Sequence, residues 1–375
     1  MSILIPYTRL SNEQKQIIER FSNVETNLFV SGPAGSGKTL ISLYILNNII
    51  ENKTERPLLL MYNHSLYGFL STSLKELGIG ENVTIATKDK LFWDIAREKK
   101  IWADKGLKSY EEKYECILNK LTNEHFNKDY GVTVVDEVQD LLPEEWNLLK
   151  RLSKKIISLG DFDQGIYNTK IDEESIKNYG EYERLDTIRR FPINIAKLAA
   201  PFSSNGDELI NMVVSDAQTQ PILVDVDFDD EYDTIIEIVD QLKIENQSIG
   251  VLCPNSTRLQ QLSDYLNNKG FEHHYYPENS DLRNHDFTST KPLLITIFSS
   301  KGLEFDKVIL FGFDDSWVID KMRKENRLKS AIFVGITRTK SSLYVIRNEY
   351  AIDELKNLKV EAIEDLEEDE YDFIF

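Results

Sequence analysis

The stretch that decides the fold is Ser31-Gly-Pro-Ala-Gly-Ser-Gly-Lys-Thr39, which contains the pattern G-x-x-x-x-G-K-[ST]. An apolar run at 27–30 precedes it and a helix-like run at 40–46 follows it, as a phosphate-binding loop between a strand and a helix requires. Glycines let consecutive backbone N–H groups face one phosphate, and the helix start adds its positive dipole end. We therefore predict a nucleoside triphosphate site made of Gly32, Pro33, Ala34, Gly35, Ser36, Gly37, Lys38 and Thr39. Lys38 would reach the β- and γ-phosphates, and the Thr39 hydroxyl would hold Mg²⁺.

The composition bounds the class of protein. The 375 residues suit two domains of ordinary size, and a hydrophobic fraction of 41% is enough for two cores. No run of about eighteen apolar residues occurs, and no basic segment opens the chain, so neither a membrane span nor a secretory signal is expected. The only cysteines, Cys116 and Cys253, lie far apart, which favours a reducing, cytoplasmic location.

The formal net charge is −19, which argues against a general nucleic-acid-coating protein. Residues 353–375 hold ten acidic residues and two lysines, a net of −8, so the remainder carries −11. Any nucleic-acid groove must then be a local basic strip on an acidic body. We interpret 361–375 as a mobile, solubilising tail; the alternative is a peptide that docks a protein, because its acids stand beside aromatic residues.

Strand-like and helix-like runs alternate along the chain, which predicts an α/β fold with mainly parallel sheets. Strands are expected at 58–61, 132–135, 155–159, 222–226, 249–252, 293–297, 307–311 and 343–347. Helices are expected, among other places, at 144–152, 232–241 and 257–269. Two polar segments interrupt the alternation: 92–129 is interpreted as a small helical insertion, and 278–292 as a loop.

Two further stretches carry candidate chemistry at strand ends. In Val134-Val135-Asp136-Glu137-Val138-Gln139-Asp140 an acid pair follows a buried strand, so it would lie at the sheet edge where ligands of open α/β folds bind. Asp136 would bind the Mg²⁺ shared with Thr39, and Glu137 would orient or deprotonate the attacking water. In Leu159-Gly-Asp-Phe-Asp-Gln-Gly-Ile-Tyr167, Gln164 would contact the γ-phosphate and that water.

Taken together, these stretches resemble the motifs of the UvrD/Rep-like superfamily 1 helicases, from about residue 9 to residue 347. The matching segments are Leu10-Ser-Asn-Glu-Gln14, the phosphate loop, Asp136–Asp140, Gly160–Tyr167, Leu185-Asp-Thr-Ile-Arg-Arg-Phe191, Thr296-Ile-Phe-Ser-Ser-Lys-Gly-Leu-Glu304 and Val334-Gly-Ile-Thr-Arg338. The resemblance implies two RecA-like domains with an ATP cleft between them. Residues 1–184 would form the first domain, 185–352 the second, and 353–375 an acidic C-terminal tail.

The resemblance also implies roles for single residues. Gln14 would read adenine, while Arg190 and Arg338 would reach the γ-phosphate from the second domain. Gly302 and Glu304 would lie against the nucleotide, with Glu304 near the ribose. The candidate catalytic residues are then Glu137, Gln164, Arg190 and Arg338, and the candidate nucleic-acid contacts are Tyr62, Asn63, His64, Thr87 and Tyr167.

Two of these nucleic-acid contacts have an ordinary alternative. Tyr62 would stack on a base, or else pack under the helix that follows it. The run 85–88 would line the strand path, or else form an ordinary loop.

The chain departs from the family at three points. Thr169 stands where the family has a base-stacking tryptophan, Phe298 stands where it has a histidine, and the accessory insertions are reduced. We predict an ATP-dependent DNA helicase or single-strand DNA translocase that uses ATP and Mg²⁺. The alternative is an ATPase motor or switch subunit that acts with a separate nuclease or effector, in DNA repair or anti-phage defence, and unwinds little by itself.

Overall fold

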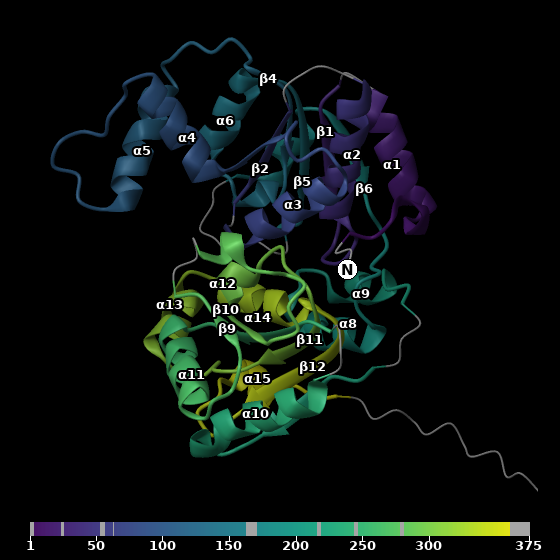
Figure 1. Cartoon of the computed structure of the whole chain (residues 1–375), viewed down its shortest axis with the longest axis vertical. Coiled ribbons are helices and arrows are strands. Elements are labelled where there is room, and N and C mark those ends of the chain that lie inside the picture. Colours follow the sequence, from purple (N-terminus) through teal and green to yellow (C-terminus); the bar gives the residue numbers. More distant parts are fainter. Residues whose placement is uncertain are drawn as a thin grey trace, which may run out of the picture.

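The computed structural model describes residues 4–23, 26–52, 57–62, 64–162, 171–215, 219–243, 247–277 and 281–360. Figure 1 shows two α/β bodies, one above the other, each built around its own sheet. Each sheet has six strands, and the paired strands are parallel throughout. The two mainly parallel sheets confirm the predicted α/β class with two RecA-like domains.

The first sheet has the order β3-β2-β4-β5-β1-β6. Its strands are β1 (Leu28–Ser31), β2 (Pro57–Met61), β3 (Thr84–Thr87), β4 (Tyr130–Val135), β5 (Ser153–Gly160) and β6 (Glu181–Arg184). The helices of this domain are α1 (Asn12–Asn23), α2 (Lys38–Asn52), α3 (His64–Glu76), α4 (Lys88–Glu98), α5 (Tyr110–Leu121), α6 (Pro143–Leu152) and α7 (Glu173–Lys177). The central strands are apolar and buried, as expected for parallel strands covered on both faces.

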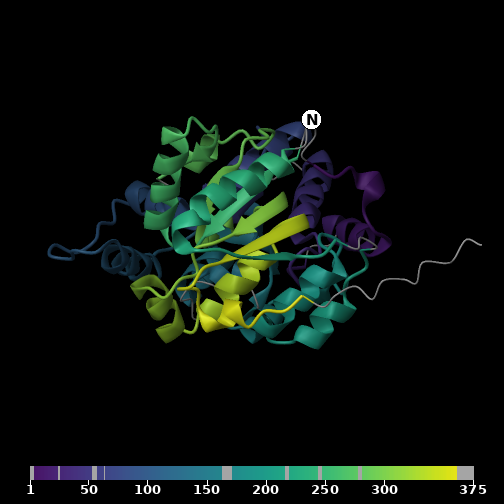
Figure 2. The ribbon, with the colours of Figure 1, turned by 90° about the horizontal axis from the view of Figure 1, so that it is seen from below.

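The second sheet has the order β7-β12-β11-β8-β10-β9. Its strands are β7 (Ile222–Asp225), β8 (Ile249–Cys253), β9 (His274–Tyr275), β10 (Leu293–Thr296), β11 (Phe305–Leu310) and β12 (Thr339–Arg347). Its helices are α8 (Ile193–Ala199), α9 (Gly206–Asn211), α10 (Glu231–Leu242), α11 (Ser256–Asn268), α12 (Ile297–Ser300), α13 (Trp317–Lys324), α14 (Leu328–Ile336) and α15 (Asp353–Lys356). Seen from below, these helices lie on both sides of the sheet (Figure 2).

Strand register decides where the candidate site forms. Ser31 of β1 pairs with Gly160 of β5, and Val135 of β4 pairs with Ser158 of the same strand. The loops after these three parallel strands therefore leave the sheet at one edge. The phosphate loop, the acid pair and the segment after Gly160 start side by side for this reason.

The helical insertion begins earlier than predicted. The run 85–88 is not a loop: it contains the end of β3 and the first residue of α4, so the helix starts four residues before the predicted 92. That this run lines the path of a nucleic-acid strand stays a prediction. Thr87 has extended backbone at the N-cap, and the apolar face that follows, with Leu91 and Phe92, packs with α5 and α6. Local helix signals and core packing therefore extend the helix up to the strand.

Other boundaries also differ from the sequence prediction. Ile297 belongs to α12 rather than to a strand, because Thr296 caps that helix by accepting a hydrogen bond from the Ser299 N–H at 3.1 Å. The predicted loop at 278–292 contains a 3₁₀ turn at Asp281–Asn284 that packs on α3 of the first domain. Within the described residues, no helix combines the length and the apolar character needed to cross a membrane.

Candidate nucleotide site

The phosphate loop forms a tight turn at the carboxyl end of β1. Gly35 and Gly37 have φ values of +82° and +89°, in the left-handed region that favours glycine. Lys38 Nζ donates to the carbonyl oxygens of Gly32 at 2.7 Å and Pro33 at 3.1 Å, so the lysine folds over the loop. The Ser36 hydroxyl is buried and has no hydrogen-bond partner among the described residues. An unsatisfied donor inside a loop of this shape fits a phosphate ligand.

The first acid of the pair faces the loop. Thr39 Oγ1 donates to Asp136 Oδ2 at 2.8 Å, and the Asp136 side chain is buried. Burial and the neighbouring Glu137 carboxylate raise the pKa of Asp136 to about 7, so the carboxyl gains from a cation. A hydroxyl and a carboxylate side by side are oxygen donors of the kind that Mg²⁺ prefers. The residues present therefore fit the predicted metal.

The second acid is held by a glutamine that the sequence analysis did not single out. Glu137 has a φ of +59°, a conformation uncommon outside glycine and often found at functional sites. Gln139 Nε2 donates to its carboxylate, and Gln139 Oε1 accepts from the Asp161 N–H at 3.1 Å. A Cβ at Gly160 would lie 2.7 Å from Gln139 Oε1, so this glycine makes room for the amide. Gln139 thus connects Glu137 to the segment after β5. It lies in the segment Asp136–Asp140, which is one of the segments that carry the family resemblance.

A lysine from the second domain completes the surroundings of Glu137. Lys301 Nζ lies 2.8 Å and 2.6 Å from the two carboxylate oxygens of Asp140 and 3.8 Å from the Glu137 carboxylate. Its side chain is only 2% exposed. Burial alone would raise the pKa of Glu137, but the cations Lys301, Lys38 and Arg338 outweigh it and hold that pKa below its usual value. Glu137 is therefore an ionised, oriented carboxylate.

The two candidate arginines lie on the second-domain side of the site. Arg338 is fully buried and donates to the backbone oxygens of Val334 at 3.2 Å and Leu303 at 3.1 Å. Burial and nearby Arg190 lower its pKa to about 9, so a phosphate would be a favourable partner.

Arg190 is already engaged by the predicted ribose contact. Its Nε donates to the Glu304 carboxylate at 2.8 Å. Burial would raise the pKa of Glu304, but Arg190 and Lys340 hold it at about 2. Arg190 must therefore share or leave Glu304 to reach a phosphate. A Cβ at Gly35 would lie 2.7 Å from Arg190 Cβ, and the Arg189 N–H donates to the Gly35 carbonyl at 3.2 Å, so the chain at Arg190 packs on the phosphate loop.

Gln14 and Gly302, two further predicted nucleotide contacts, both lie against other parts of the protein. Gln14 is buried and donates to the Ser36 carbonyl at 2.9 Å, so its amide braces the loop. Gly302, with a φ of +82°, faces first-domain Leu66: a Cβ there would lie 3.1 Å from the leucine methyl groups. It therefore lies at a contact between the domains. Gln164 lies outside the described residues, as do Tyr167 and Thr169.

Two family models match the chain over the segments that carry this geometry. An AAA domain matches residues 14–170, and a UvrD-like helicase C-terminal domain matches residues 278–350. The chain belongs to the UvrD/Rep-like superfamily 1 helicases. The phosphate loop, the acid pair and Gln14 fall inside the first match, and Lys301, Glu304 and Arg338 fall inside the second.

Two solved structures are similar to this superfamily 1 chain. The helicase of PRRSV shares 14% identity with a TM-score of 0.46, over 94% of this chain and 57% of its own. An arterivirus nonstructural protein 10 (helicase) shares 14% identity with a TM-score of 0.44, over 92% of this chain and 64% of its own. The chain thus spans less than two thirds of the length of either. No curated protein matches it.

The nucleic-acid candidates of this superfamily 1 chain lie at the ends of β2 and β3. Tyr62 is half-buried, and Lys88 Nζ lies 4.9 Å from the centre of its ring, so the ring is partly packed and partly accessible. Thr87 is 2% exposed, and its hydroxyl has no hydrogen-bond partner among the described residues. His64 is the first residue of α3, and Asn63 lies outside the described residues.

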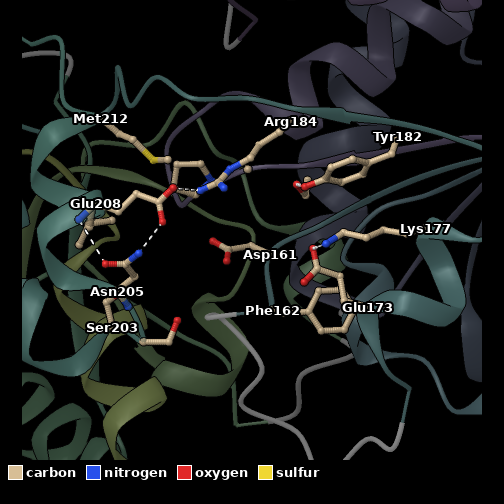
Figure 3. Close-up of a pocket in the computed structure, with 15 residues that line it drawn as sticks. Asp161, Phe162, Glu173, Lys177, Tyr182, Arg184, Ser203, Asn205, Glu208 and Met212 are labelled. Carbon is tan, nitrogen blue, oxygen red and sulfur yellow. Dashed lines mark hydrogen bonds and ion pairs between the residues drawn. The ribbon is translucent and has the colours of Figure 1, made fainter.

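A polar cavity of about 220 Å³ opens beside the phosphate loop. Its lining joins Gly32 and Asp161 of the first domain to Glu208 of α9. Figure 3 shows Asp161 between the Arg184–Glu208 ion pair on one side and Phe162 on the other. The phosphate loop and the segment after Gly160 supply part of this lining, and the residues of α7, β6 and α9 join them only in the fold.

Proposed function

We propose that this protein is an ATP-driven motor on single-stranded DNA, a helicase or translocase that hydrolyses ATP between its two domains. The observation that carries the proposal is the composite site around Glu137. A phosphate loop and an ordered carboxylate lie on one domain, and the second domain supplies Lys301, Arg190 and Arg338 around it. Both matched family descriptions support this motor over the nuclease- or effector-associated subunit.

The chemistry we propose is attack of water on the γ-phosphate. Glu137, oriented by Gln139, accepts the proton of the attacking water as the oxygen–phosphorus bond forms and the bond to the β-phosphate oxygen breaks. Lys38 and the two arginines neutralise the charge that spreads over the phosphate oxygens. Thr39 and Asp136 would hold Mg²⁺, which neutralises the β- and γ-phosphate oxygens when bound.

The same geometry suggests how hydrolysis would drive movement. ATP bound between the domains would attract the arginines of the second domain, and its hydrolysis would release them. The first domain presents α3 to the second: the Ser65 hydroxyl donates to the Ser299 carbonyl, and Phe69 and Phe287 pack edge to face with ring centres 6.2 Å apart. Since α3 starts two residues after Tyr62, a change where α3 packs on the second domain would shift Tyr62, the proposed nucleic-acid contact.

A cytoplasmic location is part of the proposal. Its support is that both cysteines, Cys116 and Cys253, are free.

The test is the ATP hydrolysis rate of the purified chain, alone and with single-stranded DNA, single-stranded RNA or duplex, at two salt concentrations. We expect stimulation by single-stranded DNA that weakens as salt rises, because phosphate contacts release counterions. Lys38→Ala is the control for contaminating ATPase activity. Hydrolysis that no nucleic acid accelerates would refute the motor.

A further inference from the structure

The segment 99–109 between α4 and α5 has no role in the site described above. It projects from the first domain on the side away from the sheet (Figure 1). Trp102 lies on it with 64% of its surface exposed. A large indole left in water contributes little to a core, and tryptophan is among the residue types enriched at contact surfaces.

This segment is also locally basic on an acidic protein. Residues 97–108 hold five basic and two acidic residues, in a chain whose net charge is −19. Asp104, one of the two acids, forms an ion pair with Lys120, with 2.7 Å between Oδ1 and Nζ. Lys100, Lys105 and Lys108 are exposed, and no carboxylate among the described residues lies within 4.0 Å of their ammonium groups. Their charge is available to an anionic partner.

The backbone of the segment is fixed by its own hydrogen bonds. The Trp102 carbonyl accepts from Lys120 Nζ at 2.8 Å. At the other end the Lys108 N–H donates to the Glu112 carboxylate at 2.9 Å, and Ser109 with Glu112 forms a capping box at the start of α5. The backbone that carries the exposed indole is therefore already ordered, so less conformational entropy is lost on binding.

A chain of contacts joins this insertion to the candidate strand contact in the cleft. Lys88 Nζ lies 4.9 Å from the ring centre of Tyr62 and 5.1 Å from that of Tyr114. Tyr114 stacks on Tyr110, ring centres 5.9 Å apart, and Tyr110 is half exposed at the start of α5. The insertion and Tyr62 thus belong to one packed unit.

We propose that the segment 99–109 is a second contact for single-stranded nucleic acid, in which Trp102 stacks on a base and Lys100, Lys105 and Lys108 face phosphates. The inference rests on the proposed function and gives that motor a strand contact outside the cleft. A flat indole among unpaired lysines matches the stacking and charge that single strands require.

The test is the affinity of the full chain for fluorescein-labelled oligothymidylate and oligouridylate, measured by anisotropy over a range of salt. Trp102→Ala should weaken binding by about 5- to 140-fold, the loss expected for one stacked base, while Trp102→Phe keeps most of the affinity. Tyr350→Ala is the matched control, since Tyr350 is 56% exposed on the second domain. Lys105→Glu should lower the slope of log affinity against log salt by about 0.7, and Lys359→Glu should leave it unchanged. The DNA and RNA arms show which strand is preferred.

Two results overturn the inference while leaving the motor intact. In the first, the wild-type ATPase is stimulated by a single strand, yet Trp102→Ala and Lys105→Glu bind it as the wild type does. In the second, a synthetic peptide of residues 361–375 binds the wild type, and both variants lose that peptide but keep the oligonucleotides; the partner is then an acidic protein segment. If the wild type neither binds nor responds to any strand, the proposed function fails and this contact fails with it.

Discussion

The cross-domain contact of Lys301 with Asp140 makes the sharpest prediction about stability. Both side chains are buried, 2% and 0% exposed, and the two N–O distances are 2.8 Å and 2.6 Å. Replacing Lys301 by methionine keeps the length of the side chain and removes its charge, which leaves the Asp140 carboxylate buried without that cation. Breaking a buried pair in this way costs about 3–5 kcal/mol of unfolding free energy. Burial raises the pKa of Asp140 to about 7 even beside Lys301, so near pH 7.5 the carboxyl can take up a proton once the lysine is gone, and the loss should lie at the lower end of this range.

The assay is a double-mutant cycle in urea, followed by tryptophan fluorescence and circular dichroism. Lys301→Met should lose about 3–5 kcal/mol, and Lys301→Met with Asp140→Asn should recover at least about 2 kcal/mol of that loss, because the unpaired charge is gone. Since Lys301 is the first of the cations that hold down the pKa of Glu137, Lys301→Met should also move the acidic limb of the ATPase pH profile to higher pH. Losses that simply add in the double variant, with an unmoved pH profile, would refute the contact as described.

Three further predictions concern single residues. Glu137→Gln should lower kcat by about 10²- to 10⁴-fold while fluorescent-nucleotide binding persists, because the variant loses the general base but keeps the phosphate loop; unchanged turnover would contradict the assignment. Gly68→Ala should lower the unfolding free energy by about 1–3 kcal/mol, because the added Cβ would lie 2.9 Å from the Arg283 carbonyl oxygen. A urea midpoint equal to that of the wild type would show that α3 and residues 281–287 do not pack in this way. Burial and neighbouring His274 lower the pKa of His285 to about 4, so the unfolded chain binds its proton first and stability is lost as pH falls from about 6.5 toward 4. The groups facing it are His274, Tyr276, Asp286 and Phe287, and partial exposure limits the effect to about 1–2 kcal/mol. His285→Phe should reduce the difference between urea midpoints at pH 7 and pH 5; an equal difference in both proteins would exclude the histidine as its source.

Local patterns predicted much of the fold because the relevant signals are short. The phosphate loop combines glycines with an apolar strand before and a helix after, and the acid pair follows a run of buried β-branched residues. The edge strand β6 was missed because its sequence, Glu-Tyr-Glu-Arg, has no apolar run. It is held by pairing with β1 and by ion pairs of Arg20 with Glu181 and Glu183, more than 150 residues away in the chain. Pairing between residues so far apart in the chain cannot be predicted from a short stretch of sequence.

The site was predictable in its parts but not in its connections. The acid pair after a buried strand indicated Glu137, the resemblance indicated Arg190 and Arg338, and the fold shows what surrounds each of them. That Lys301 bridges to Asp140, 161 positions away, depends on how two domains pack. The same holds for Gly302, whose partner Leu66 belongs to the other domain.

The central claim is that ATP is hydrolysed at a site shared by two domains and that a single strand controls it. The most direct measurement is steady-state ATP turnover with saturating single-stranded DNA for the wild type and Arg190→Ala. We predict strand-stimulated turnover in the wild type and a loss of about 10³- to 10⁵-fold in kcat in the variant, with ATP still bound. Equal turnover by the two proteins, or wild-type turnover indifferent to the strand, would contradict the account.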